Sequence, residues 1–494
     1  MNENKNNIKA MAVHGVAWTM VEKYSGQIVQ FIIQIILARL LTPSEYGLIG
    51  VLAIFMAIST VFIDGGFSAA LIQCKNRSQR DLSTVFYLNV AIALTIYLIL
   101  CLSAPWIAQF LKHPILTRII RIYCLTLVIN SLSSTGQTIL TINLDFKTTT
   151  KISFASGVIS GIIGIVMAYC DYGVWALVGQ SIAYAAVTTL LTFILVRWVP
   201  RHGFSSDSFR RLFSFSSRLF AASLISAVYE KIFGIIIGKM FSTSALGFYD
   251  RAISFNQLLN NNISTVLGRV SYPLLSRIQD DDERLIGIYR RYIEISAFLT
   301  FPLLMMLCGI AKPLILALLT AKWAPSILLL QVLTFGFLWD GVIVSNLNLI
   351  KVKGRSDLVL KLEIIKKLIA FTLCIGSLVV FRSVLALCIA KAIYGFIALI
   401  LNTIYTKKLL NYGFLRQLRD YRAYLAASVG VLAISLLASE LISNSWIALF
   451  TGIVFSGLFY LTICHCFRLY AYTETIGILQ SKLGPIVGKF RKNS

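Results

Sequence analysis

Long apolar runs recur along almost the whole chain, and they restrict the fold more than any other sequence feature. A helix needs about 20 mostly apolar residues to cross the roughly 30 Å hydrocarbon layer of a bilayer. Runs of that length alternate with short polar breaks from Val13 to Phe467, and 57% of the 494 residues are hydrophobic. One soluble core does not bury that much apolar surface, so the sequence predicts an integral membrane protein.

The apolar runs are continuous, which favours a helical bundle over a membrane β-barrel. Barrel strands show about ten residues of alternating polarity, whereas a helix satisfies its own backbone hydrogen bonds within one apolar segment. The first run, from Val13 to Leu41, is too long for a cleavable signal and contains no convincing cleavage site. We therefore expect an all-α integral membrane protein that keeps this run as its first spanning helix.

Fourteen spanning helices are expected from the apolar runs and the polar breaks between them. The expected spans are residues 14–38, 46–72, 83–108, 116–140, 152–170, 174–196, 215–238, 247–273, 290–311, 325–350, 359–381, 384–406, 423–442 and 446–467. An even count places both ends of the chain on the same side of the membrane.

Lysine and arginine residues concentrate in alternate loops, and this pattern orients the helices. Loops that stay in the cytoplasm keep an excess of these residues. The loop after the second expected span carries Lys75, Arg77 and Arg80, whereas the loop from Thr42 to Glu45 carries no basic residue. The same alternation continues to the carboxy end, so we expect both termini in the cytoplasm.

The formal net charge of +24 does not predict a nucleic-acid partner. The basic residues lie in short blocks between apolar runs instead of forming one soluble face. The nine cysteines lie mostly in apolar runs without a CxxC pair, so no disulfide framework is expected.

The sequence offers little support for an enzyme. It contains no GxxxxGK[ST], HExxH or GxSxG motif, which argues against a nucleotide-driven pump or a common hydrolase. His465 lies between Cys464 and Cys466, but three adjacent residues on a helix point in different directions. We therefore expect neither a metal site nor a cofactor.

Two similar halves are visible in the sequence. Residues 36–50 realign with residues 236–250 at an offset of 200, which predicts a repeat of six helices in the same orientation. The alternative is that two apolar helices joined by a Ser/Gly turn resemble each other by chance. The expected organisation is an N-lobe at 1–200, a cytoplasmic linker at 201–212, a C-lobe at 213–408, and the last two helices with a basic tail at 409–494.

Ionisable residues inside the expected spans are the candidates for function. A charged side chain that faces hydrocarbon costs roughly 3 kcal/mol or more, so such residues are expected to line the bundle interior or a water-filled cavity. The candidates are Glu22, Lys23, Asp64, Arg118, Arg121, Glu230, Lys231, Arg251, Arg269 and Asp340. Lys391 is a further ionisable residue in the twelfth span. Glu363, Lys366 and Lys367 lie near the cytoplasmic end of their span and are expected to anchor at the inner membrane surface.

The depth of each candidate in its span decides between a site and an anchor. Arg118 and Arg121 share one helical face and suit a diphosphate, but their place near the helix start also suits snorkelling to the outer headgroups. Glu230 and Lys231 lie near the middle of their span, which favours a cavity. Arg251 and Arg269 lie near the two ends of theirs, where interfacial anchoring is the alternative.

Seven segments, in order along most of the chain, resemble Wzx-type polysaccharide flippases and exporters. They are LLTPSEYGLIG at 40–50, FIDGGFSAALIQ at 62–73, YGVWALVGQ at 172–180, GKMFSTSALGFYDRA at 238–252, RVSYPLLSRIQDD at 269–281, KWAPSILLLQVL at 322–333 and KGRSDLVLKLEII at 353–365. The chain looks most similar to the lipopolysaccharide, colanic acid and teichuronic acid exporter branch of the multidrug, oligosaccharidyl-lipid and polysaccharide exporter superfamily.

This resemblance implies two six-helix lobes around a central cavity, with two more helices at the carboxy end. It implies that an undecaprenyl-diphosphate-linked oligosaccharide is flipped to the outer leaflet by alternating access. In such a fold the first, second, seventh and eighth helices line the cavity, which implies a role for most of the candidates above. Membrane lipids, a polysaccharide polymerase and chain-length machinery are the implied partners, and the bacterial inner membrane is the implied location. Energy coupling stays open between a proton or sodium ion bound at Asp64, Glu230 or Asp340 and the membrane potential itself.

Three other functions stay open from the sequence. A drug or metabolite antiporter of the same superfamily would have a smaller, less cationic cavity with acidic ion sites. A membrane-embedded polymerase or ligase would present a large outer loop, whereas the outer loops here are short. A scaffold in a synthesis complex would transport nothing.

Overall fold

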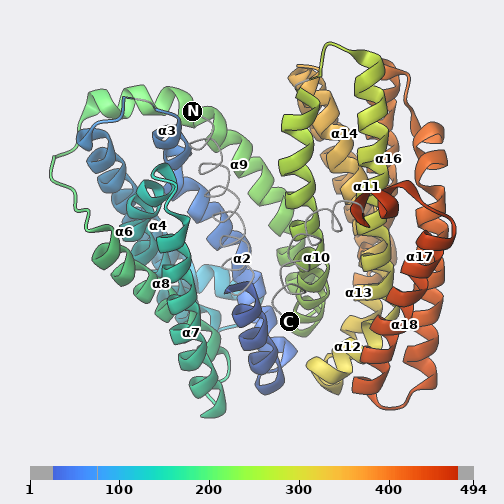
Figure 1. The fold of residues 1–494 in the computed structure, drawn as a ribbon. Coiled ribbons are helices and arrows are strands. Elements are labelled where there is room, and N and C mark those ends of the chain that lie inside the picture. Colours follow the sequence, from blue (N-terminus) through green and yellow to red (C-terminus); the bar gives the residue numbers. More distant parts are fainter. Residues whose placement is uncertain (1–25, 75, 277, 477–494) are drawn as a thin grey trace, which may run out of the picture. The chain divides into compact units, whose positions relative to one another are not determined.

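The computed structural model describes residues 26–74, 76–276 and 278–476, and its regular elements in these ranges are all helices (Figure 1). The expected all-α class is confirmed. The chain divides into two compact units, Met1–Gly247 and Phe248–Ser494, and each is described by itself. The lobe and linker boundaries expected from the repeat stay a prediction.

The first unit is a bundle of long helices with short connections. After a helix at Gly26–Leu40 it contains α2 (Pro43–Asp64), α3 (Phe67–Gln73), α4 (Gln79–Leu111), α5 (Leu116–Tyr123), α6 (Leu125–Ile142), α7 (Phe146–Tyr169), α8 (Val174–Val196) and α9 (Ser206–Met240). The helix α7 packs along α8, α6 also packs on α8, and α2 packs along α9. One apolar core of this unit joins Ile33 and Leu37 to Ala176 and Leu177.

The second unit holds most of α10 (Thr243–Ser276) and all later helices. These are α11 (Asp282–Gly309), α12 (Ala311–Leu318), α13 (Ser326–Phe337), α14 (Asp340–Val352), α15 (Ser356–Phe381), α16 (Val384–Leu410), α17 (Phe414–Leu441) and α18 (Ser445–Cys466). The helix α17 packs along both α11 and α18, and α16 packs against α13 and α15. Phe301 is fully buried, with its ring edge-on to Trp339 and Tyr421 at 5.7 and 5.5 Å between centroids.

Local sequence explains where individual helices begin and break. Thr42 caps α2 in a capping box with Glu45, and Pro43 occupies the first turn, where its missing N–H costs nothing. Between α2 and α3, Gly65 and Gly66 have φ of 54° and 78°, a conformation that glycine adopts without strain. This glycine pair breaks one apolar run into two helices.

Twelve segments of the described chain are long and apolar enough to cross a membrane, so the protein is a multi-pass membrane protein. These segments coincide with twelve of the fourteen expected spans. The other two differ for separate reasons. The helix at Gly26–Leu40 is apolar but shorter, and the span expected there begins outside the described residues. The helix α10 is long enough, at 34 residues, but is too polar to qualify. The count of fourteen therefore stays a prediction.

Candidate functional site

The second unit brings one candidate residue into a polar cluster. Asp340 begins α14, and its carboxylate accepts a hydrogen bond from the Asn260 side-chain amide of α10 at 2.7 Å. The side-chain amide oxygen of Asn260 in turn accepts a hydrogen bond from the Ser264 hydroxyl at 3.5 Å. An acidic residue in the first turn is favoured by the partial positive charge of the helix N-terminus. Asp340 is thus held by a polar face of α10.

A buried cation faces the same cluster from α15. The Lys366 ammonium lies 2.5 Å from a carboxylate oxygen of Glu363, and the Lys366 side chain is 6% exposed. Its charge also acts on the Asp340 carboxylate. A buried charge is costly unless it is paired, and the ion pair with Glu363 lowers the cost of burying Lys366.

Two further cations of the second unit lie against aromatic rings. Arg251 on α10 is buried, and its guanidinium carbon is 5.4 Å from the centre of the Trp323 ring. The Lys391 ammonium on α16 donates to the Tyr249 hydroxyl and lies 5.0 Å from that ring centre. Aromatic faces attract cations, which lowers the cost of holding Arg251 and Lys391 inside the bundle.

Glu230 and Lys231 are exposed in the middle of a spanning segment of the first unit. They are adjacent on α9, within the segment Leu219–Met240 that is apolar enough to cross a membrane. At the end of the same helix, the Lys239 ammonium lies 2.9 Å from the centre of the Phe110 ring. Glu230 and Lys231 therefore place opposite charges at a depth where hydrocarbon would reject them.

The other candidates of the first unit have different surroundings. Arg118 and Arg121 are exposed on the short helix α5, and Arg121 donates to the Cys101 carbonyl at 3.5 Å. The Asp64 carboxylate accepts from the Gly66 N–H at 3.3 Å, which stabilises the turn between α2 and α3. Asp64 thus has a clear structural role in that turn.

The interactions found in the described residues do not join one candidate to another. Asp340 accepts a hydrogen bond from Asn260 and feels the charge of Lys366, and neither of these was an expected site residue. Arg269 belongs to α10, and Glu22 and Lys23 lie outside the described residues. The site assignment for these residues stays a prediction.

Sequence reasoning missed Lys366 as part of this cluster. It was expected to anchor at the inner membrane surface, but a side chain that is 6% exposed and paired with Glu363 does not reach headgroups. The signal was present, because Glu363 and Lys366 are opposite charges spaced i,i+3 on one helix face. Asn260 had no such signal, since its partner Asp340 lies 80 residues away.

Known proteins provide an independent comparison. Residues 36–328 match a family model described as polysaccharide biosynthesis protein. The teichuronic acid biosynthesis protein TuaB of Bacillus subtilis (strain 168) is 25% identical over 354 residues, which is 71% of this chain and 73% of TuaB. The lipopolysaccharide biosynthesis protein WzxC of Escherichia coli (strain K12) is 23% identical over 363 residues, which is 73% of each chain.

Two solved structures show the same fold. The lipid II flippase MurJ in an inward closed conformation matches with a TM-score of 0.73 at 15% identity, over 93% of this chain and all of that one. An inward-facing multidrug resistance MATE family transporter matches with a TM-score of 0.59 at 15% identity, over 80% of this chain and 98% of that one. With the family model covering more than half of its 494 residues, the chain belongs to the polysaccharide biosynthesis protein family.

Proposed function

We propose that this protein is a flippase that carries an undecaprenyl-diphosphate-linked oligosaccharide from the cytoplasmic to the outer leaflet of the bacterial inner membrane. Family membership and the names of the relatives, which concern biosynthesis of teichuronic acid and lipopolysaccharide, support a cargo used in polysaccharide synthesis. The fold shared with a lipid II flippase supports transport of a lipid-linked sugar.

The observation that carries the proposal is the exposure of Glu230 and Lys231 at mid-span. Lipid contact at that depth costs roughly 3 kcal/mol or more for each charge. A water-filled space beside α9 removes this cost, and a flippase needs such a space because a sugar diphosphate cannot enter hydrocarbon. The lipid tail has no such need and stays in the membrane.

The cations supply the attraction for the diphosphate. Lys231, Arg118 and Arg121 are exposed in the first unit, and arginine pairs with phosphate oxygens through charge-assisted hydrogen bonds. In the second unit we assign the same role to Arg251 and Arg269 on α10. Lys23 adds a further cation, while Glu22 and Asp64 are assigned to the same cavity as acids that can pair with the cations, because the family resemblance implies that their helices line it.

The division of the chain into two compact units supports transport by alternating access. We place both termini in the cytoplasm, because the basic loops alternate along the chain. Asp340, held by Asn260 and influenced by Lys366, is our choice for binding a coupling proton or sodium ion. A membrane potential that is negative inside would also favour outward movement of the diphosphate, by about 2.3 kcal/mol per charge per 100 mV.

The fold shared with a MATE transporter favours one second candidate, a multidrug or metabolite antiporter. The sequence relatives favour the flippase, since their names concern polysaccharide synthesis. A polysaccharide polymerase and its chain-length machinery are proposed as partners that receive the flipped product.

Reconstituted vesicles test the proposal. Purified protein is incorporated into liposomes that contain a fluorescent undecaprenyl-diphosphate oligosaccharide, and a membrane-impermeant reductant then reports which leaflet holds the label. We expect protein-dependent exchange between leaflets, and near-complete loss of exchange in Lys231→Ala. The control is Lys408→Ala, which removes an exposed lysine at the end of α16. No exchange together with proton-coupled dye uptake would support the antiporter, and new glycosidic bonds would support a polymerase.

A further inference from the structure

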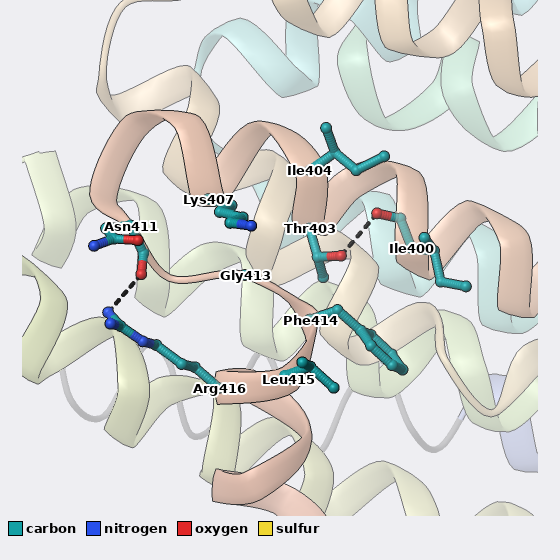
Figure 2. A pocket seen from close by; sticks show the side chains of 9 residues that line it. All are labelled: Ile400, Thr403, Ile404, Lys407, Asn411, Gly413, Phe414, Leu415 and Arg416. Carbon is teal, nitrogen blue, oxygen red and sulfur yellow. Dashed lines mark hydrogen bonds between the residues drawn. The ribbon is translucent and has the colours of Figure 1, made fainter.

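A groove lies in the second unit where α16 ends and α17 begins (Figure 2). Its cavity volume is about 380 Å³, which is within the range of small-molecule sites. Its lining residues are Ile400, Thr403, Ile404, Lys407, Asn411, Gly413, Phe414, Leu415 and Arg416. The candidate site described above shares none of these residues.

The two ends of the groove differ in chemistry. Figure 2 shows Lys407, Asn411 and Arg416 on one side, and Ile400, Ile404 and Phe414 on the other. The Arg416 guanidinium donates to the Asn411 carbonyl at 2.6 Å, which fixes its direction. Lys407 is exposed and has no acidic partner within the described part of the chain. The polar end of the groove is therefore cationic.

The apolar end is open to the surroundings of the helices. Leu415 is 78% exposed and Ile404 is 43% exposed. Both lie near the ends of membrane-spanning segments, Val384–Leu410 and Phe414–Leu441. An exposed apolar surface at this level faces acyl chains, while cations at the helix ends face headgroups.

A hydrogen-bond network holds the turn between α16 and α17, beside the groove. The Tyr412 carbonyl accepts from the Thr406 hydroxyl at 3.0 Å and from the Gln417 amide at 3.3 Å. The Tyr412 hydroxyl donates to Asp420, which also accepts two hydrogen bonds from Arg290 of α11 at 2.9 and 2.7 Å. The turn between α16 and α17 is thus fixed before any ligand arrives, which reduces the ordering cost of binding.

We propose that this groove binds one anionic phospholipid of the cytoplasmic leaflet. Lys407 and Arg416 hold the phosphate, and Ile404, Phe414 and Leu415 contact the first carbons of an acyl chain. The lipid would then rest against the turn that the Asp420 network ties to α11. This inference depends on the membrane topology but not on the transported cargo.

Binding to full-length purified protein in detergent tests the proposal. Phosphatidylglycerol is titrated against phosphatidylcholine with identical tails, and retention is measured by native mass spectrometry. The test variant is Lys407→Gln with Arg416→Gln. The matched control is Lys408→Gln with Arg419→Gln, which removes two exposed cations from the same helix ends without touching the groove.

We expect wild type to retain one phosphatidylglycerol in preference to phosphatidylcholine. The test variant should bind it roughly 25-fold more weakly, because each of the two basic residues near a membrane surface contributes about a fivefold factor. The control should bind it as wild type does. Equal weakening in both variants would overturn the proposal in favour of general surface charge.

Two further probes separate the source of the phosphate. Glycerol phosphate without tails should not compete, and competition by it at similar concentrations would show that the apolar end takes no part. Undecaprenyl diphosphate should bind the test variant as well as it binds wild type. A matching loss of that lipid would assign the groove to the cargo instead of to a phospholipid.

Discussion

Gly47 of α2 and Gly247 of α10 occupy equivalent positions where the first turns of the two helices cross. A methyl group on Gly47 would lie 1.7 Å from the carbonyl oxygen of Thr243, and one on Gly247 would lie 2.0 Å from that of Pro43. The Ser44 and Thr243 hydroxyls hydrogen-bond across the same crossing at 2.8 Å. The segments that realign at an offset of 200 in the sequence therefore meet in the structure, with a reciprocal contact of glycine on backbone.

We expect Gly47→Ala and Gly247→Ala each to destabilise this crossing. The obstructing atoms belong to the backbone, so relief requires the two helices to move apart. Overpacking of this kind costs about 1–3 kcal/mol. Thermal unfolding of the purified protein in detergent measures the change, and both variants should unfold at lower temperature than wild type.

Gly457→Ala on α18 is the matched control, since no atom lies within 4 Å of the added carbon. It should unfold at or slightly above the wild-type temperature, because alanine is the better helix former. Equal behaviour of Gly47→Ala and Gly457→Ala would show that the α2 and α10 crossing is not close in solution.

Lys366→Met should be destabilising. The substitution leaves Glu363 without its ion-pair partner and removes the cation that acts on Asp340. Removing one member of a fully buried ion pair costs about 3–5 kcal/mol, but Glu363 is 38% exposed and water solvates its carboxylate, so we expect a loss of about 1–2 kcal/mol. Unfolding in denaturant measures the loss, and Lys361→Met, which removes an exposed lysine one turn away, should have little effect.

The double variant Lys366→Met with Glu363→Gln tests the pairing itself. It should recover part of the lost stability, because the unpaired carboxylate is gone. No recovery would indicate that the Lys366 charge serves Asp340 alone.

The helices were predictable from sequence because their cause is local. Each apolar run forms its own backbone hydrogen bonds, so run length alone located twelve segments such as Val384–Leu410. The apolar run also predicted a helix at α10, but the sequence does not say why that helix carries so many polar side chains. The structure gives them hydrogen-bond partners far away in the sequence, as when Asn348 donates to Ser271 at 2.8 Å.

Residues of the candidate site were harder to predict, because burial depends on which helices pack together. Lys366 and Lys367 are neighbours in sequence, yet Lys366 alone is buried. The groove beside Arg416 left no sequence signal either, since the turn next to it is tied to Arg290, which lies 130 residues from Asp420.

Gln417→Leu should loosen the turn between α16 and α17. The Gln417 amide donates to the Asn346 side chain at 2.8 Å and to the Thr406 hydroxyl at 3.2 Å, and all three groups are buried. The substitution removes these two hydrogen bonds, each of which contributes about 0.5–1.5 kcal/mol. Hydrogen exchange at residues 406–417 should speed up, whereas Gln257→Leu, at an exposed position of α10, should leave exchange there unchanged.

Asp145 links the stability of the first unit to pH. Its carboxylate caps α7, accepting from the Thr148 hydroxyl at 2.7 Å and from the Thr148 N–H at 3.0 Å. These hydrogen bonds hold the pKa of Asp145 below its ordinary value of 3.8. Because the folded pKa is the lower one, the stabilisation is complete above pH 3.8 and is lost as pH falls through the folded pKa.

Asp145→Ala should therefore lower the free energy of unfolding by about 1 kcal/mol at pH 7, the usual contribution of an N-cap. As the pH falls below the ordinary aspartate pKa of about 3.8, protonation removes the same cap from wild type, so the difference between the two proteins should shrink. Thermal unfolding at pH 7, 5 and 3 measures this convergence. Asp280→Ala, at an exposed turn, should track wild type at every pH. A constant gap between wild type and Asp145→Ala would show that the carboxylate does not act as a charged cap.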